Sequence, residues 1–119
     1  MKQPGPDHPI TLSRVPGRIT VSANGAVIAS SEHALEMREA SYPPVYYLPR
    51  EDVEIDALDQ SDHTTHCPYK GDASYYSIPS LGAAGENAVW SYETPFSAVA
   101  DIVGCLAFYP DRVKIDVAD

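Results

Sequence analysis

The sequence predicts a mainly β protein, a small antiparallel sheet or open barrel with one or two short helices. Short runs of β-branched and aromatic residues recur along the 119-residue chain, and turns rich in Gly and Pro separate them. Strands with such spacing are typical of antiparallel sheets. No Gly-rich phosphate loop follows an expected strand, which disfavours a parallel dinucleotide-binding fold.

The expected elements divide the chain into an extended N-terminal arm, residues 1–16, and a single domain, residues 17–119. The arm contains four prolines and little periodicity, and we expect it to pack on the domain. Within the domain, runs of apolar residues and their alternation with polar ones predict the strands. The expected strands are 18–23, 26–29, 45–48, 53–58, 63–67, 73–78, 87–92, 106–109 and 113–117.

Turn and cap signals mark a hairpin and two helices. Asn24-Gly25 predicts a hairpin, because a type I′ turn needs positive φ at both central positions. A serine pair predicts a short helix over residues 30–37, since a serine oxygen can accept a hydrogen bond from a free N–H of the first turn. A Thr-Pro pair predicts a second helix over residues 94–104, with Val99 and Val103 on its inner face.

The chain is strongly acidic, with a net charge of −9 from eight Lys and Arg against seventeen Asp and Glu. Binding to nucleic acid phosphates or to an anionic membrane surface requires a basic surface. The composition therefore disfavours both partners. No segment holds the roughly 20 apolar residues that a bilayer span requires. The N-terminus also lacks the apolar core of a signal peptide, so we expect a cytoplasmic protein.

The cysteines and histidines predict no metal site. Cys67 and Cys105 are the only cysteines, and in the cytoplasm both are expected to be reduced thiols. Two thiolates are too few for a structural zinc site with three or four. His63 and His66 would project from opposite faces of a strand, so they form no site by themselves. We expect neither a metal nor a cofactor.

Reactive side chains are concentrated between Ser61 and Tyr76. This stretch holds two of the four histidines, one of the two cysteines, a lysine, two aspartates and three tyrosines. Cys67 is the candidate nucleophile and Asp72 the candidate acid or base, because a thiol gains reactivity beside a cation or a base. Structural and ligand-contacting roles stay open for Cys67, since cysteine is often a small buried side chain.

Cations and aromatic rings near this stretch suggest a ligand cleft. Lys70, in an expected turn, is a candidate point charge for an anion. Arg50 can recognise carboxylate or phosphate with two hydrogen bonds, or can form surface ion pairs with Glu51 and Asp52. Aromatic rings belong to the core or form the wall of the cleft. The candidate ligand-binding residues are Tyr46, Arg50, His66, Tyr69, Lys70, Trp90 and Tyr92.

Four motifs carry a resemblance to a known family. They are residues 42–53 (YPPVYYLPREDV), 62–73 (DHTTHCPYKGDA), 87–93 (NAVWSYE) and 107–113 (AFYPDRV). Together, in this order, they resemble the DUF427 family, an uncharacterised bacterial domain sometimes labelled NTP_transf_9. Residues 4–10 (PGPDHPI) are similar to the N-terminal extension of one bacterial branch.

The resemblance implies a small antiparallel β-tent (Mss4-like) domain. It does not imply the zinc of some tent-like relatives, because this chain lacks their paired cysteines. The family has no established activity. Its nucleotidyltransferase label has no counterpart in this sequence, which contains no Gly-Ser with spaced aspartates, no P-loop and no evident metal triad.

Three functions agree with the sequence. The first is binding of a small anionic or aromatic metabolite in a cleft around the His-Cys-Pro-Tyr-Lys-Gly-Asp motif, residues 66–72. The second is a transferase or hydrolase that uses Cys67 or Asp72. The third is a structural or interaction module that acts as a homodimer.

Overall fold

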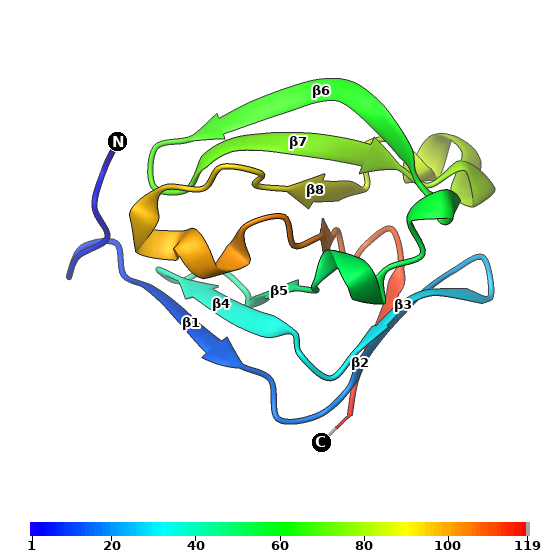
Figure 1. Cartoon of the computed structure of the whole chain (residues 1–119), viewed down its shortest axis with the longest axis horizontal. Coiled ribbons are helices and arrows are strands. Elements are labelled where there is room, and N and C mark those ends of the chain that lie inside the picture. Colours follow the sequence, from blue (N-terminus) through cyan, green and yellow to red (C-terminus); the bar gives the residue numbers. More distant parts are fainter. Residues whose placement is uncertain (119) are drawn as a thin grey trace.

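Three small antiparallel sheets make up the fold (Figure 1). The computed structural model describes residues 1–118. The strand orders are β1-β4-β5, β10-β2-β3 and β6-β7-β8-β9. The strands are β1 (Ile10–Arg14), β2 (Ile19–Ala23), β3 (Ala26–Ser31), β4 (Leu35–Glu39), β5 (Val45–Tyr47), β6 (Asp59–Cys67), β7 (Gly71–Ser77), β8 (Val89–Ser91), β9 (Ala107–Phe108) and β10 (Lys114–Val117).

Four 3₁₀ helices connect these strands: η1 (Arg50–Asp52), η2 (Ile55–Ala57), η3 (Pro79–Gly85) and η4 (Ser97–Ile102). The mainly antiparallel β class predicted from the sequence is confirmed. Within residues 1–118 the sheets stay separate and do not close into a barrel. The β-tent (Mss4-like) likeness stays a prediction.

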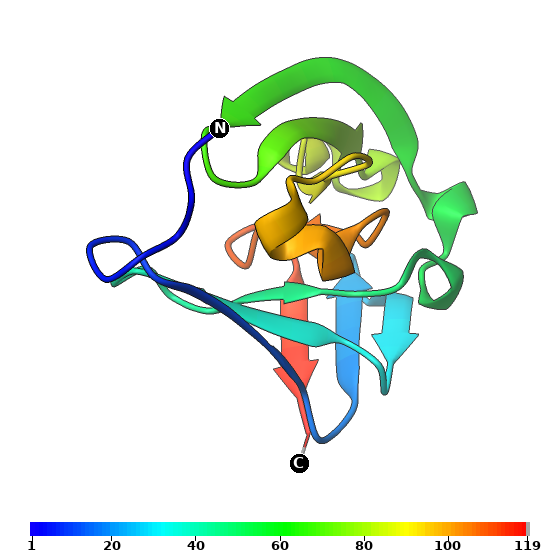
Figure 2. The ribbon, with the colours of Figure 1, turned by 60° about the vertical axis from the view of Figure 1, so that its left-hand side comes forward.

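The N-terminal arm is tied to the rest of the chain at both ends. Its strand β1 pairs with β4, with Ile10 opposite Glu39 and Arg14 opposite Leu35. Near the start of the chain, the Lys2 amide donates to the Pro68 carbonyl at 2.7 Å. Figure 2 shows the dark blue N-terminal segment reaching from the lower sheet toward the turn between β6 and β7. The arm therefore bridges two sheets.

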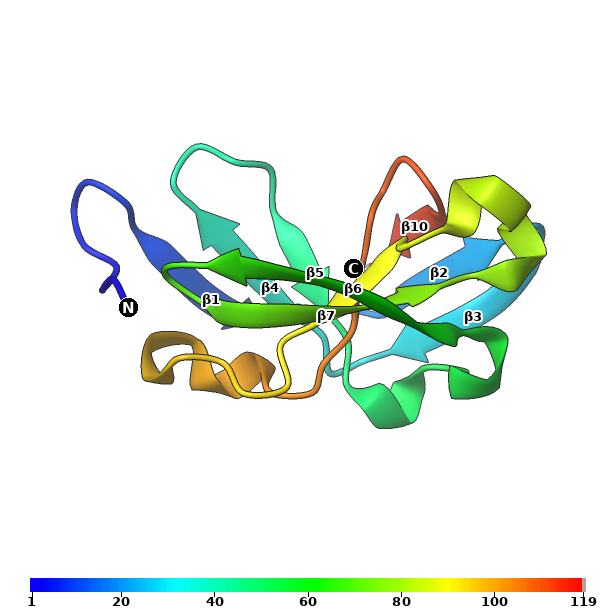
Figure 3. The same ribbon diagram turned by 90° about the horizontal axis from the view of Figure 1, so that it is seen from above.

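Two predicted hairpins form, and in each of them the turn depends on residues that are neighbours in the sequence. Asn24 and Gly25 both have positive φ, 51° and 78°, as a type I′ turn between β2 and β3 requires. The predicted pairing of residues 63–67 with 73–78 is also confirmed, in the hairpin of β6 and β7. Seen from above, these two strands run side by side across the molecule (Figure 3).

The predicted helix over residues 30–37 is wrong, because this segment completes β3 and begins β4. The serine oxygen that was expected to start a helix instead closes a turn. The His33 amide donates to Ser31 Oγ at 3.0 Å, and Ser31 Oγ donates to Asp52 at 2.6 Å. β4 then pairs with β1 on one side and β5 on the other. These long-range ladders outweigh the local helix signal.

The predicted strand over residues 53–58 is also wrong. Val53 forms only an isolated bridge with Ala29, and the chain then turns through η2. The Ala57 amide donates to the Glu54 carbonyl at 3.0 Å, which closes the 3₁₀ turn. Glu54 and Asp56 stay exposed, so the alternation of apolar and acidic residues reflects a surface turn.

The predicted second helix is shorter than expected and is 3₁₀ rather than α. η4 buries Val99 and Ile102, three residues apart, while Val103 is 57% exposed. The chain is kinked at Val99, whose φ of −127° and ψ of 30° are not helical, so η4 consists of two short turns. Its ends are fixed because Phe96 N–H donates to the Lys70 carbonyl and Gly104 N–H donates to the Tyr92 carbonyl.

Two apolar clusters form the core. The first joins β2 and β3 to β8 and β9 through residues such as Ile19, Val21, Val89 and Phe108. The second joins β4, β5, β7 and η4 and includes Met37, Tyr47, Tyr75, Tyr92, Val99 and Ile102. The third sheet contributes to both clusters, so it holds the two halves of the molecule together.

We predict that Gly85→Ala destabilises the protein, because an added Cβ would lie 2.1 Å from the Ile78 carbonyl oxygen. Residues 78 and 85 are also held together by a backbone hydrogen bond, because the Ile78 amide donates to the Gly85 carbonyl at 2.9 Å. Overpacking of this kind costs about 1 to 3 kcal/mol, which lowers Tm by several degrees. Gly5→Ala is the matched control, since nothing lies within 4 Å of its Cβ. Equal Tm values for both variants would contradict the packing.

Candidate functional site

A cavity of about 1000 Å³ lies among the described residues. Its walls come from the N-terminal arm, β4, β5, the β6–β7 turn and strands β7 to β10. Nine of the lining residues are Tyr, Trp or Phe: Tyr42, Tyr46, Tyr47, Tyr69, Tyr75, Trp90, Tyr92, Phe108 and Tyr109. A cavity of this size and lining is typical of sites for small organic molecules.

Most of the predicted site residues meet at this cavity. Those in its wall are Tyr46, His66, Cys67, Tyr69, Lys70, Trp90 and Tyr92. Arg50 and Asp72 do not line it. The sequence motif at residues 66–72 thus supplies one side of the cavity, and the strands β5 and β8 supply the facing rings.

Arg50 links three segments outside the cavity. Its guanidinium donates to the Gly104 carbonyl at 3.2 Å, to the Tyr76 hydroxyl at 3.2 Å and to Glu93 at 3.0 Å. Burial would lower the pKa of Arg50, but the hydrogen bond to the Tyr76 hydroxyl and the Glu93 charge raise it. The expected pairs with Glu51 and Asp52 are wrong, because the side chain turns toward β7 instead. Arg50 therefore stabilises the fold around η1.

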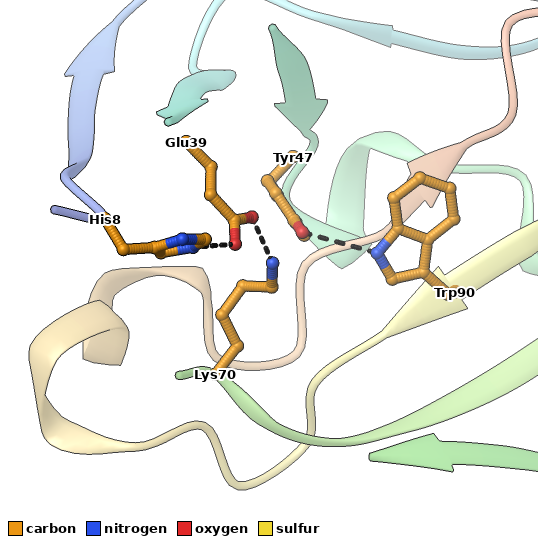
Figure 4. A network of polar contacts seen from close by, with 5 residues as sticks. All are labelled: His8, Glu39, Tyr47, Lys70 and Trp90. Carbon is orange, nitrogen blue, oxygen red and sulfur yellow. Dashed lines mark hydrogen bonds and ion pairs between the residues drawn. The ribbon is translucent and has the colours of Figure 1, made fainter. Parts of the chain in front are cut away.

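The Glu39 carboxylate contacts both Lys70 and His8 at the cavity wall (Figure 4). Lys70 Nζ donates to Glu39 Oε1, and His8 Nε2 lies 2.7 Å from Glu39 Oε2. The side chains of Lys70 and Glu39 are only 11% and 13% exposed. Burial would raise the pKa of Glu39, but the hydrogen bonds from Lys70 and His8 lower it below its ordinary value.

Lys70 is therefore not the free turn cation that the sequence predicts. Glu39 balances its charge, and the neighbouring backbone is fixed because Lys70 N–H donates to the Cys67 carbonyl at 3.3 Å. An ammonium group has three donors, and the contact with Glu39 uses one. A role for Lys70 in ligand binding stays a prediction, and it now includes Glu39 as a partner.

The N-terminal arm closes one side of the cavity through ring stacking. The rings of His8 and Tyr69 stack at 3.9 Å between centroids, with 9° between their planes. Lys2 Nζ lies 5.8 Å from the centroid of the Tyr69 ring. A cation over an aromatic face is attracted by the ring quadrupole. These contacts fix Tyr69 as a wall of the cavity.

Trp90 and Tyr47 define the opposite wall (Figure 4). Trp90 Nε1–H donates to the Tyr47 hydroxyl at 3.3 Å, and the two rings meet edge to face. Tyr109 packs on the other side of Trp90, with ring centroids 4.5 Å apart. Burial raises the pKa of Tyr47 and Tyr92, so both hydroxyls stay neutral and can donate or accept.

Cys67 and Asp72 are separated by the alternation of the strands. His66 lies opposite Asp72 in the β6–β7 register, and His66 Nδ1 lies 2.7 Å from Asp72 Oδ1 on the exposed face. Cys67, which follows His66, is half-buried in the cavity wall. Both cysteines are free thiols, as predicted, and burial raises the pKa of Cys105.

Sequence reasoning missed His8, Glu39 and Tyr47. His8 belongs to the arm, where no local pattern indicates a site. Glu39 had a usable signal, because alternation along β4 places it on the same face as Leu35 and buried Met37. Tyr47 is 1% exposed, and the tyrosine pair alone does not reveal which ring faces inward.

The structure is a small antiparallel β fold with a cavity rich in aromatic side chains. The chain belongs to the DUF427 family, because the model of that family, NTP_transf_9, a domain of unknown function, matches residues 11–119. The resemblance stated from the motifs is thus confirmed. No curated protein matches the chain.

Two further properties of the described chain bear on the site. No helix among residues 1–118 has the length and apolar character needed to cross a membrane. Within the same residues, no group of three or more His, Cys, Asp and Glu side chains is placed to hold a metal ion.

We predict that Glu39→Gln destabilises the protein at neutral pH and that this loss shrinks in acid. The native pKa of Glu39 is below its ordinary value of 4.5, so the unfolded chain binds more protons between the two values. The stability due to the carboxylate is therefore complete above the unfolded pKa and is lost as pH falls through the native pKa. Urea unfolding of both proteins from about pH 7 to about pH 3 measures this.

The matched control for this pH series is Glu32→Gln. Glu32 pairs with Arg18 on the surface, with 63% of the Glu32 side chain exposed. An exposed pair contributes about 0 to 1 kcal/mol, so this variant should differ little from wild type at any pH. A Glu39→Gln loss that is constant across the pH series would refute the charged network.

Proposed function

We propose that this protein binds a small aromatic metabolite that carries a hydrogen-bond acceptor, such as a carboxyl or carbonyl group. The observation that carries the proposal is the aromatic cavity of about 1000 Å³ with the Lys70–Glu39 pair in its wall. Ligand sites of this size combine apolar walls with a few placed polar groups, which fix the orientation of the ligand.

The aromatic part of the ligand is supported by the walls and by the mouth of the cavity. Tyr42 is 62% exposed and Tyr109 is 38% exposed, and both line the cavity. Large exposed apolar groups gathered at one place are typical of binding sites. Rings favour other rings in offset or edge-to-face contact, which suits a planar ligand between Tyr69 and Trp90.

The acceptor group is supported by the donors in the wall. Lys70 contributes the donors that Glu39 does not use, and the neutral hydroxyls of Tyr47 and Tyr92 can donate as well. Glu39 offsets the Lys70 charge, and the whole chain carries a net charge of −9. These charges favour a ligand with one acceptor group over a polyanion.

The positions of the two catalytic candidates favour binding over catalysis. Asp72 does not line the cavity, and the side-chain contact of His66 goes to Asp72 rather than to the Cys67 thiol. The two free cysteines agree with the reducing cytoplasm that the sequence predicts. The homodimer stays a prediction.

Intrinsic fluorescence tests the proposal, because Trp90 is the only tryptophan and lies in the cavity wall. We expect at least one compound among simple aromatic acids, aromatic amides and purine bases to quench Trp90 saturably. The same compound should raise Tm, since a ligand at 100 times its Kd adds about 2.7 kcal/mol of stability.

Two variants locate the binding. Tyr42→Ala should lower the affinity for the quenching compound several-fold without loss of protein stability, because Tyr42 lines the cavity and is largely exposed. Tyr76→Phe is the control, since Tyr76 bonds Arg50 and does not line the cavity. The proposal fails if no compound quenches Trp90, or if Tyr42→Ala and Tyr76→Phe bind the compound equally well.

A further inference from the structure

A second, polar cavity adjoins the aromatic one. Its volume is about 480 Å³, and Tyr75 and Tyr109 line both cavities. Beyond these two rings the lining changes character, from aromatic to charged and polar. The residues found only in the second cavity are His63, Ala83, Glu86, Asn87, Asp111 and Arg112.

Backbone and side-chain bonds hold these polar groups in place. Arg112 Nη1 donates to the Ala84 carbonyl at 2.7 Å, which ties the β9–β10 turn to η3. The Asn87 backbone N–H donates to Ser77 Oγ at 3.0 Å, and the Tyr109 backbone N–H donates to the Ala88 carbonyl at 3.0 Å. The second cavity is therefore built from turns that are held together by these hydrogen bonds.

The donors and acceptors in this cavity suit hydroxyl groups. Glu86 and Asp111 are carboxylate acceptors, while the Arg112 guanidinium and the side-chain NH₂ of Asn87 are donors. A hydroxyl group both donates and accepts, so neighbouring hydroxyls on a ring can use both kinds of partner. Two carboxylates against one guanidinium disfavour a phosphate or a carboxylate in the same place. His63 completes the wall, with its ring 4.6 Å from that of Tyr75.

We propose that the ligand of the aromatic cavity carries a sugar or a similar hydroxylated ring, and that the second cavity holds this ring. The inference rests on the proposed function, because it assigns the other end of the same ligand. Tyr109 lies between the two parts, with its ring against Trp90 on the aromatic side. The ligand class is then an aromatic glycoside, with the aromatic ring beside Trp90 and the sugar beyond Tyr109.

Calorimetric titration of the full chain with matched probes tests the inference. The pairs are 4-nitrophenol with 4-nitrophenyl β-D-glucopyranoside, and adenine with adenosine, with free glucose as the third probe. We expect at least one glycosylated probe to bind tenfold or more tightly than its aromatic parent, and glucose to bind weakly. Equal affinities within each pair, with the aromatic parents binding, would overturn the inference and leave the proposed function intact.

A double variant assigns the gain to the second cavity. Glu86→Ala with Asp111→Ala removes both acceptors, and both residues are exposed, so the fold should persist. The tenfold gain should disappear while the aromatic parent binds unchanged. Glu51→Ala, an exposed carboxylate outside both cavities, is the control. A gain that survives in the double variant overturns the assignment. Absence of binding by every probe refutes the proposed function, and the inference with it.

Discussion

The paired charges of Glu39 and Lys70 are the constraint on which the cavity depends. Both side chains are almost buried, and a buried charge without a partner is strongly unfavourable. The pair joins the end of β4 to the turn between β6 and β7, which are 31 residues apart in the sequence. His8 adds the N-terminal arm to the same carboxylate. The start of the arm, the end of β4 and the β6–β7 turn are therefore held at one point.

The cavity follows from this arrangement. The β6–β7 turn lies against β4 through the charge pair, and the aromatic rings of β5 and β8 meet farther in. The Tyr47 hydroxyl accepts the Trp90 Nε1–H, so the indole ring can stand in an apolar wall without an unpaired donor. The stack of His8 on Tyr69 completes the side near the arm. The hollow is thus enclosed by groups that the fold already fixes.

Local chemistry made part of this structure predictable. The Asn24-Gly25 turn and the β6–β7 hairpin depend on neighbours in the sequence, and both were predicted correctly. The helix expected over residues 30–37 failed because β4 is stabilised by β1 and β5, which the local pattern does not reveal. Of the reactive stretch that the sequence singles out, residues 66–70 line the cavity. The partner of Lys70 lay 31 positions away, so sequence spacing could not identify it.

A double-mutant cycle on Glu39→Gln and Lys70→Met tests the central role of this pair most directly, with stabilities taken from urea unfolding near pH 7. Loss of one partner of a buried pair costs roughly 3 to 5 kcal/mol, because the other charge is left unpaired. The account predicts that each single variant is strongly destabilised and that the double variant loses at least about 1 kcal/mol less than the sum. Losses that add within about 0.5 kcal/mol would contradict it.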